Sequence, residues 1–131
     1  MPHKLSQARE TKLISWNVAG ANSKFKDQAW KDYVSKFDIL ALQETWDMSE
    51  GLFLEGFQSF SVPAQGSIRG RPSGGLLTLI SLKLNCTVFS LRHKSPYLQI
   101  LHLKFSHKIE LLLFNIYNVP SQMHLMLLPS E

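Results

Sequence analysis

One apolar stretch, Phe37–Trp46, constrains the fold more than any other part of the chain. It reads Phe-Asp-Ile-Leu-Ala-Leu-Gln-Glu-Thr-Trp, and a short apolar run between polar residues is typical of a strand buried on both faces. The run ends in a carboxylate, Glu44. A carboxylate near a domain interior needs a partner, such as a basic side chain or a metal ion. Glu44 is therefore either the first exposed residue after the strand, which this stretch alone favours, or a ligand for a hard cation such as Mg²⁺.

The residues before this stretch predict a strand and a helix. Lys12–Val18 is rich in β-branched and aromatic residues, which favours a strand. An amphipathic helix is predicted next, because apolar residues recur at helical spacing between charged ones: Phe25, Ala29, Trp30, Tyr33, Val34 and Phe37. Strand, helix and strand in this order form a βαβ unit, so the two strands are expected to be parallel in one sheet.

The rest of the chain is rich in predicted strands. Pro63–Ser73 carries several Gly and Pro residues together with Arg69 and Arg71, which predicts a mobile basic loop. The predicted strands are Gly56–Val62, Leu76–Leu82, Asn85–Leu91, Leu98–Phe105 and Ile109–Tyr117, the last two forming a hairpin. One βαβ unit followed by antiparallel strands predicts a layered α/β or α+β domain.

Composition excludes several classes of protein. The chain has 131 residues, of which 44% are hydrophobic and 18% charged, as expected for one globular domain and not for a disordered chain. No apolar run is long enough to span a bilayer, and Met1–Thr11 has no apolar core of the kind found in signal peptides. A single cysteine, Cys86, excludes an internal disulfide and a Cys-based zinc site. We therefore expect an intracellular protein, nuclear or cytoplasmic and not secreted.

Polar residues gather at the ends of three predicted strands. These residues are Asn17, Glu44 and the segment Asn115–Pro120. Layered α/β folds build their sites from side chains at strand ends. Taken singly, each residue has a structural interpretation that is at least as good, because Asn17 suits a turn, Asn115 a loop and Tyr117 a sheet edge. The predicted site depends on the three segments occurring together.

Together, the segments resemble a known family. The sequence has Ser15-Trp16-Asn17-Val18, Leu42-Gln43-Glu44-Thr45, Gly74-Gly75-Leu76 and Asn115-Ile116-Tyr117-Asn118-Val119-Pro120, in that order. This pattern resembles the endonuclease/exonuclease/phosphatase family, and most of all the apurinic-like endonuclease domain of non-LTR (LINE-type) retrotransposons. Gly70–Leu76 and the hairpin Phe105–Tyr117 also look retroelement-like. The resemblance extends from about Lys12 to Pro120.

The resemblance implies a fold, a reaction and a set of roles. The fold would be a layered β-sandwich, with two stacked sheets and helices outside. The reaction would be hydrolysis of phosphate esters with one Mg²⁺ or Mn²⁺. Within the catalytic set, Glu44 would bind the metal, Asn17 would hydrogen-bond near the metal and the scissile phosphate, and Tyr117 would touch the phosphate or orient the nucleophile. Asn115 would support the loop of Tyr117.

The resemblance also implies an anionic substrate. Asn115, Arg69 and Arg71 form the predicted substrate-binding group, and the expected partner is DNA, contacted through its phosphates. The basic loop suits other polyanions equally well, so a phosphoinositide or sphingomyelin phosphodiesterase fragment is the alternative within the family. A non-catalytic, β-rich interaction module is the alternative outside it.

The chain departs from the family pattern after Tyr117. The family's second half carries an Asp-x-Asn motif and a terminal Ser-Asp-His, whereas the only carboxylate here after Tyr117 is Glu131. We therefore predict a polar tail at 1–11, the N-terminal half of the family's domain at 12–120 and a short non-family tail at 121–131. Such a chain should bind Mg²⁺ weakly and should not cleave DNA alone. Its uncovered apolar sheet faces, predicted at Leu76–Ile80, Ile100–Leu103 and Leu111–Phe114, should promote self-association.

Overall fold

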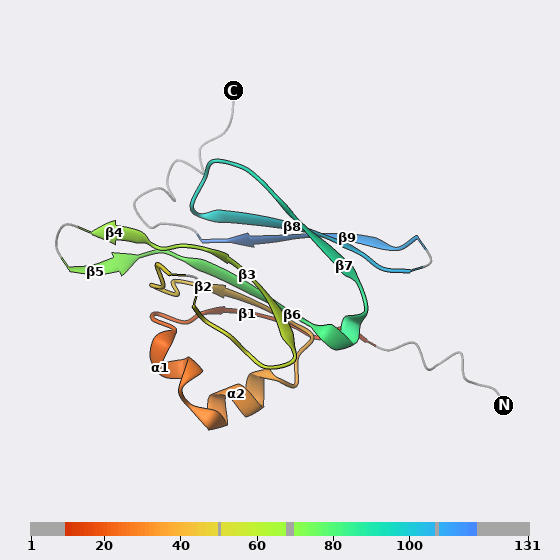
Figure 1. The fold of residues 1–131 in the computed structure, drawn as a ribbon, viewed down its shortest axis with the longest axis horizontal. Coiled ribbons are helices and arrows are strands. Elements are labelled where there is room, and N and C mark those ends of the chain that lie inside the picture. The colour runs from red at the N-terminus through yellow and green to blue at the C-terminus, as the bar shows by residue number, and fades with distance from the viewer. Residues whose placement is uncertain (1–9, 50, 68–69, 107, 118–131) are drawn as a thin grey trace, which may run out of the picture.

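A computed structural model describes residues 10–49, 51–67, 70–106 and 108–117 of the chain. In the first half, the elements are β1 (Leu13–Asn17), α1 (Asn22–Phe25), α2 (Gln28–Val34), β2 (Ile39–Gln43) and β3 (Phe57–Val62). The second half contains β4 (Gln65–Ser67), β5 (Gly70–Ser73), β6 (Leu76–Ser81), a 3₁₀ turn (Leu82–Leu84), β7 (Thr87–Leu91), β8 (Leu98–Lys104) and β9 (Glu110–Ile116). Figure 1 shows their arrangement.

A four-stranded sheet in the order β1-β2-β6-β3 forms the centre of the molecule. β1 and β2 are parallel, with Leu13 opposite Ile39 and Asn17 opposite Gln43, so the predicted βαβ unit is confirmed. β6 runs antiparallel to both of its neighbours. β2 and β6 are buried along their whole length, as the apolar composition of both predicts.

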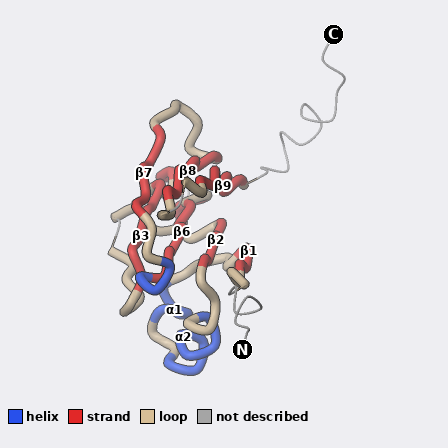
Figure 2. Tube along the Cα trace, turned by 90° about the vertical axis from the view of Figure 1, so that its right-hand side faces the viewer, coloured by secondary structure: helices blue, strands red, loops and turns tan. Residues whose placement is uncertain are grey.

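The second sheet, of three antiparallel strands in the order β7-β8-β9, packs on one face of the first. The helices cover the opposite face, and Figure 2 shows the three layers one above another. Each interface has its own apolar cluster. The helix-side cluster contains Val18, Ala21, Trp30, Val34, Leu40, Leu42, Leu54, Leu77 and Leu79. The intersheet cluster contains Ile39, Ile80, Leu84, Leu101 and Leu103.

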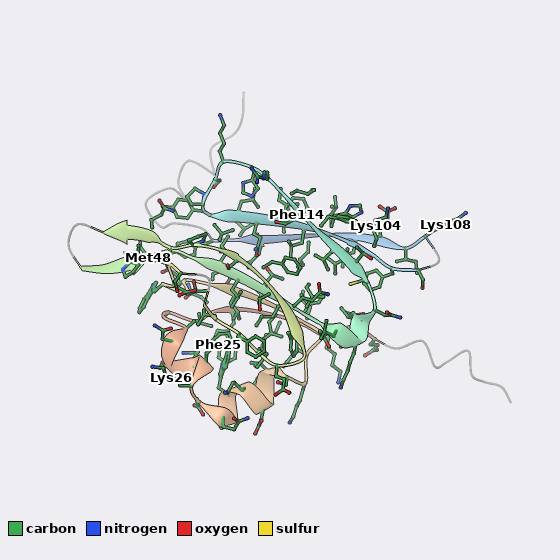
Figure 3. All side chains as sticks on the ribbon, viewed as in Figure 1. Phe25, Lys26, Met48, Lys104, Lys108 and Phe114 are labelled. Carbon is green, nitrogen blue, oxygen red and sulfur yellow. The ribbon has the colours of Figure 1, made fainter. Side chains whose placement is uncertain are left out.

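The helical region is divided, where the sequence predicted one helix from Phe25 to Phe37. Asp27 has an extended backbone, and its side chain accepts hydrogen bonds from the N–H groups of Ala29 and Trp30. This N-cap starts a second helix and so separates α1 from α2. Phe25 still packs against the helix-side cluster, as Figure 3 shows.

The segment predicted as a mobile basic loop, Pro63–Ser73, contains a short hairpin instead. β4 pairs with β5 in antiparallel fashion, with Gln65 opposite Ser73 and Ser67 opposite Gly70. Gly70 has a φ of +131°, a conformation that a residue with a side chain rarely adopts. Gly70 therefore begins β5 in a backbone conformation that suits glycine.

The predicted apolar sheet faces are only partly uncovered. Leu76–Ile80 is fully buried, because the helices cover one face of β6 and the second sheet covers the other, so the expectation for this stretch was wrong. The outer face of the three-stranded sheet is open. Its half-exposed apolar residues are Phe89, Leu91, Leu112, Phe114 and Ile116. No helix in the described part of the chain has the length and apolar character needed to cross a membrane.

Candidate functional site

Glu44 lies directly after β2 and is held by two N–H groups. Its Oε1 accepts a hydrogen bond of 2.5 Å from the indole Nε1 of Trp46 and one of 3.3 Å from the backbone N–H of Gly74. The backbone at Glu44 has a φ of +58°, which is uncommon for a residue with a side chain. Glu44 is half-buried, so it is more than the first exposed residue after a strand.

The two glycines before β6 bring a second loop against Glu44. The N–H groups of Thr45 and Trp46 donate to the carbonyls of Gly75 and Gly74. Gly75 has a φ of +94°, and a Cβ at this position would collide with the Thr45 hydroxyl. Only glycine therefore permits this approach, which places the Gly74 N–H on the carboxylate.

Tyr117 reaches Glu44 from the other sheet. It directly follows β9, and its side chain hydrogen-bonds with the Glu44 carboxylate. This hydrogen bond is the main reason that the pKa of Tyr117 is raised to about 12, and partial burial and the negative charge of Glu44 add to it. The ring of Tyr97 lies against that of Tyr117, with centroids 6.2 Å apart, and the carbonyl of Tyr97 accepts from the N–H of Tyr117. Two residues distant in sequence thus meet across the two layers.

Asn17 lies at the same edge of the sheet, at the end of β1. In the parallel pairing of β1 with β2, Asn17 lies opposite Gln43. Gln43 is the residue immediately before Glu44. Its side chain is exposed, and its Oδ1 accepts a 3.2 Å hydrogen bond from the N–H of Ala19. The amide is therefore available at the surface beside Glu44.

Asn115 is placed differently from the substrate-binding role predicted for it. Its side chain is 2% exposed, and its Oδ1 accepts a 2.8 Å hydrogen bond from Gln43 Nε2. Its Nδ2 donates to the Leu42 carbonyl at 3.2 Å. The amide is therefore buried and bonded within the protein. The substrate-binding role and the supporting role predicted for Asn115 both stay predictions, and these contacts favour the supporting one.

The predicted basic group is not assembled by the described side chains. Arg71 belongs to β5, but only its backbone is described, and Arg69 lies outside the described residues. Their contact with a substrate stays a prediction. Asn118–Pro120, the end of the third motif, and the tail at 121–131 also lie outside the described residues.

The sequence analysis missed two aromatic residues at the site, Trp46 and Tyr97. In the sequence, Trp46 is simply the end of the apolar stretch, but it lies two residues after Glu44, within reach of the same carboxylate. No sequence signal identified Tyr97, because its contact with Tyr117 depends on the pairing of β8 with β9. The Gly74-Gly75 pair was a usable signal of a close backbone approach.

The described residues fit a metal ion in part. They contain no group of three or more His, Cys, Asp or Glu side chains that could hold one. Mg²⁺, however, commonly binds through one or two carboxylates, with water and substrate phosphate completing its shell. Glu44 offers one carboxylate at the surface edge of the sheet, and the oxygen of the Asn17 side chain lies on the neighbouring strand. This set suits a hard cation but supplies few ligands.

Comparison with known proteins identifies the fold and the family. The chain is similar to the Xenopus laevis APE2 catalytic domain, with a TM-score of 0.57 and 16% identity over 86% of this chain and 47% of that one. It is also similar to the 3′ phosphatase NExo from Neisseria, solved bound to a product DNA hairpin, with a TM-score of 0.53 and 16% identity over 82% of this chain and 41% of that one. The chain thus spans about half the length of these proteins. No curated protein matches it. Residues 14–121 match the Endonuclease/Exonuclease/phosphatase family, and the chain therefore belongs to that family.

Proposed function

We propose that this chain is the metal-binding half of a phosphodiester hydrolase site of the retroelement endonuclease type, with DNA as its substrate. The observation that carries the proposal is the position of Glu44, fixed by Trp46 and Gly74 and in contact with Tyr117 from the other sheet. The retroelement assignment rests on the resemblance at Gly70–Leu76 and in the β8–β9 hairpin. The DNA hairpin bound to NExo supports the choice of substrate class.

Each residue has a distinct role in this proposal. Glu44 holds Mg²⁺ or Mn²⁺, and the ion, when bound, neutralises the charge that develops on the phosphate. Asn17 hydrogen-bonds beside the ion. Tyr117, with its pKa raised to about 12, keeps its proton at neutral pH. It therefore does not serve as a base. Its single O–H donates to Glu44 in the structure, so it would meet a phosphate oxygen as a donor only after leaving the carboxylate.

Metal binding by the isolated chain is expected to be weak. One carboxylate leaves most of the coordination to water, and Mg²⁺ gives up its water reluctantly. In the described part of the chain, Glu44 belongs to no group of three or more His, Cys, Asp or Glu side chains that could hold a metal ion. The chain alone is also expected to be inactive, because the residues of a catalytic set act as a unit and the remaining members retain little of the rate.

Paramagnetic broadening by Mn²⁺ tests the metal site directly. In NMR spectra, the amide signal of Gly74 and the indole signal of Trp46 should broaden first, because both groups donate to Glu44. Glu44→Gln should remove this selective broadening. Glu55→Gln, which changes an exposed carboxylate elsewhere, is the matched control. Broadening that survives Glu44→Gln would place the ion elsewhere and refute the assignment.

Substrate class and activity require two further measurements. Binding to duplex DNA should weaken steeply with salt if phosphate contacts provide the affinity. Tighter binding of inositol phosphates than of DNA would instead favour the lipid phosphodiesterase alternative. Supercoiled plasmid with Mn²⁺ should be nicked no faster by the chain than by its Glu44→Ala variant. Nicking that depends on Glu44 would show that the isolated chain already contains a complete site.

A further inference from the structure

A continuous row of hydrogen-bonded side chains crosses the interface between the two sheets. We call it the buried polar row, and it consists of the buried residues Gln43, Asn115, Thr78 and Gln99 together with Ser15, which is exposed at its β1 end. Gln43 Nε2 donates to Ser15 Oγ at 3.1 Å and to Asn115 Oδ1 at 2.8 Å. Asn115 Nδ2 donates to Thr78 Oγ1 at 3.1 Å, and Thr78 Oγ1 donates to Gln99 Oε1 at 2.6 Å.

The row connects every strand of the four-stranded sheet to the three-stranded sheet. Ser15, Gln43 and Thr78 belong to β1, β2 and β6. Gln99, from β8, completes the connection by donating to the carbonyl of Phe60 in β3 at 2.8 Å. Asn115, from β9, is the other member contributed by the second sheet.

The interior of this row is almost inaccessible to solvent. Gln43, Thr78, Gln99 and Asn115 are between 0% and 8% exposed. A buried amide or hydroxyl that loses its partner costs free energy, because no water replaces the missing hydrogen bond. A shift of one sheet over the other would break several of these bonds together, so the row strongly opposes such a shift.

The apolar contacts between the sheets lack this directional character. The intersheet cluster includes Ile39 at the start of β2, Ile80 near the end of β6, and Leu103 near the end of β8. These positions lie toward the opposite end of the strands from Glu44. Apolar burial is non-directional, so these contacts define the alignment of the sheets less specifically than hydrogen bonds do. The buried polar row is therefore the part of the interface that specifies how the sheets are aligned near the site.

The row is joined to the site through the backbone. Gln43 immediately precedes Glu44, and Asn115 is two residues before Tyr117. The 2.8 Å bond between Gln43 and Asn115 thus links the two strands that present the carboxylate and the phenol. We propose that the buried polar row positions Tyr117 against Glu44, and that Thr78 and Gln99 are positioning residues of the site although neither touches it. This inference depends on the proposed function only for the importance of the Glu44–Tyr117 contact.

Substitutions at Thr78 test the proposal because valine has nearly the shape of threonine. Thr78→Val removes the hydroxyl that joins Asn115 to Gln99, and Thr78→Ser keeps it. The readout is the nuclear Overhauser effect between the ring protons of Tyr117 and the side-chain protons of Glu44, measured without metal or DNA. We expect this signal to be lost in Thr78→Val and retained in Thr78→Ser.

Two controls separate alignment from general destabilisation. Ile80→Val removes one methylene from the intersheet cluster and should retain the Tyr117–Glu44 signal. The hydrogen bond from Trp46 to Glu44 lies within one loop and should survive in every variant, as reported by the indole N–H resonance of Trp46.

The outcomes are distinct. Retention of the Tyr117–Glu44 signal in Thr78→Val, or its equal loss in Ile80→Val, would overturn the proposal. Asn115→Leu, which cuts the row at its centre, should lose the signal as Thr78→Val does. If Asn115→Leu does not fold, the Thr78 pair decides the question. This experiment uses no metal or substrate, so its result is independent of the Mn²⁺ test. Either the positioning of Tyr117 or the metal site can therefore be refuted while the other is supported.

Discussion

At the scale of single residues, the contact between Glu44 and Tyr117 determines how the site responds to pH. The carboxylate accepts the phenolic hydrogen bond and disfavours a second negative charge beside it, which raises the pKa of Tyr117 to about 12. Since the folded-state pKa lies above the usual value of 10.0, folding favours the neutral phenol. This contribution to stability is fully present below pH 10.0 and is lost as the pH rises toward about 12.

Alkaline titration tests this contact. The ultraviolet absorbance of tyrosinate should show one phenol that ionises near pH 12, and Tyr117→Phe should remove that transition. Glu44→Gln should move the transition to lower pH, because a neutral amide lacks the charge that opposes ionisation. An unchanged titration in Glu44→Gln would contradict the contact.

The close approach at Gly75 gives a second prediction. Gly75→Ala should destabilise the fold by about 2–4 kcal/mol, because an alanine there would combine a positive φ with a collision against Thr45. Gly56→Ala is the matched control, since Gly56 has a φ of +85° but nothing within 4 Å of the added Cβ. It should cost only about 1 kcal/mol, from backbone strain alone. Equal losses in urea unfolding would show that the collision is relieved without cost.

At the scale of elements, the boundary between α1 and α2 depends on one side chain. Asp27→Ala should lower the free energy of unfolding by about 0.5–2 kcal/mol, because it removes the acceptor for two N–H groups at the start of α2. Asp32→Ala removes an exposed carboxylate from the same helix, together with its hydrogen bond from Gln28, and serves as the control. Urea unfolding of both variants measures the difference. A larger loss for Asp32→Ala would mean that the cap has little importance.

At the scale of the whole molecule, the outer face of the three-stranded sheet predicts self-association. Phe114 is 52% exposed and Leu112 is 53% exposed. Phe89, Leu91 and Ile116 add further exposed apolar area to this face, beside the His102–Glu110 pair. Apolar patches of this kind promote association between molecules. Phe114→Lys should therefore lower the apparent mass in size exclusion with light scattering.

The control for association is a substitution away from this face. Phe53 is 68% exposed and lies before β3, far in sequence from the three-stranded sheet. Phe53→Lys adds the same charge and should leave the apparent mass unchanged. A wild-type chain that runs as a sharp monomer at all concentrations would contradict the prediction.

The sequence by itself determined those features that depend on local pattern. Alternating and continuous apolar runs predicted β1, β2, β6, β8 and β9, and the βαβ order predicted the parallel pair. Local pattern also placed Asn17, Glu44 and Tyr117 at the ends of predicted strands, but their roles in a site came from the family resemblance and stay predictions. Local pattern also gave one wrong prediction. The apolar periodicity predicted a single helix from Phe25 to Phe37, whereas the N-cap at Asp27 starts a second helix.

The tertiary structure alone decided which strand ends meet. Tyr117 contacts Glu44 because the three-stranded sheet stacks on the four-stranded one in one alignment, and no local pattern encodes that alignment. Likewise, Asn115 could be a ligand-facing residue or a buried one, and its hydrogen bonds to Gln43 and Leu42 are visible only once the layers are packed. The physical reason is that periodicity specifies which face of a strand is buried, whereas the partner across the interface depends on contacts between residues remote in the chain.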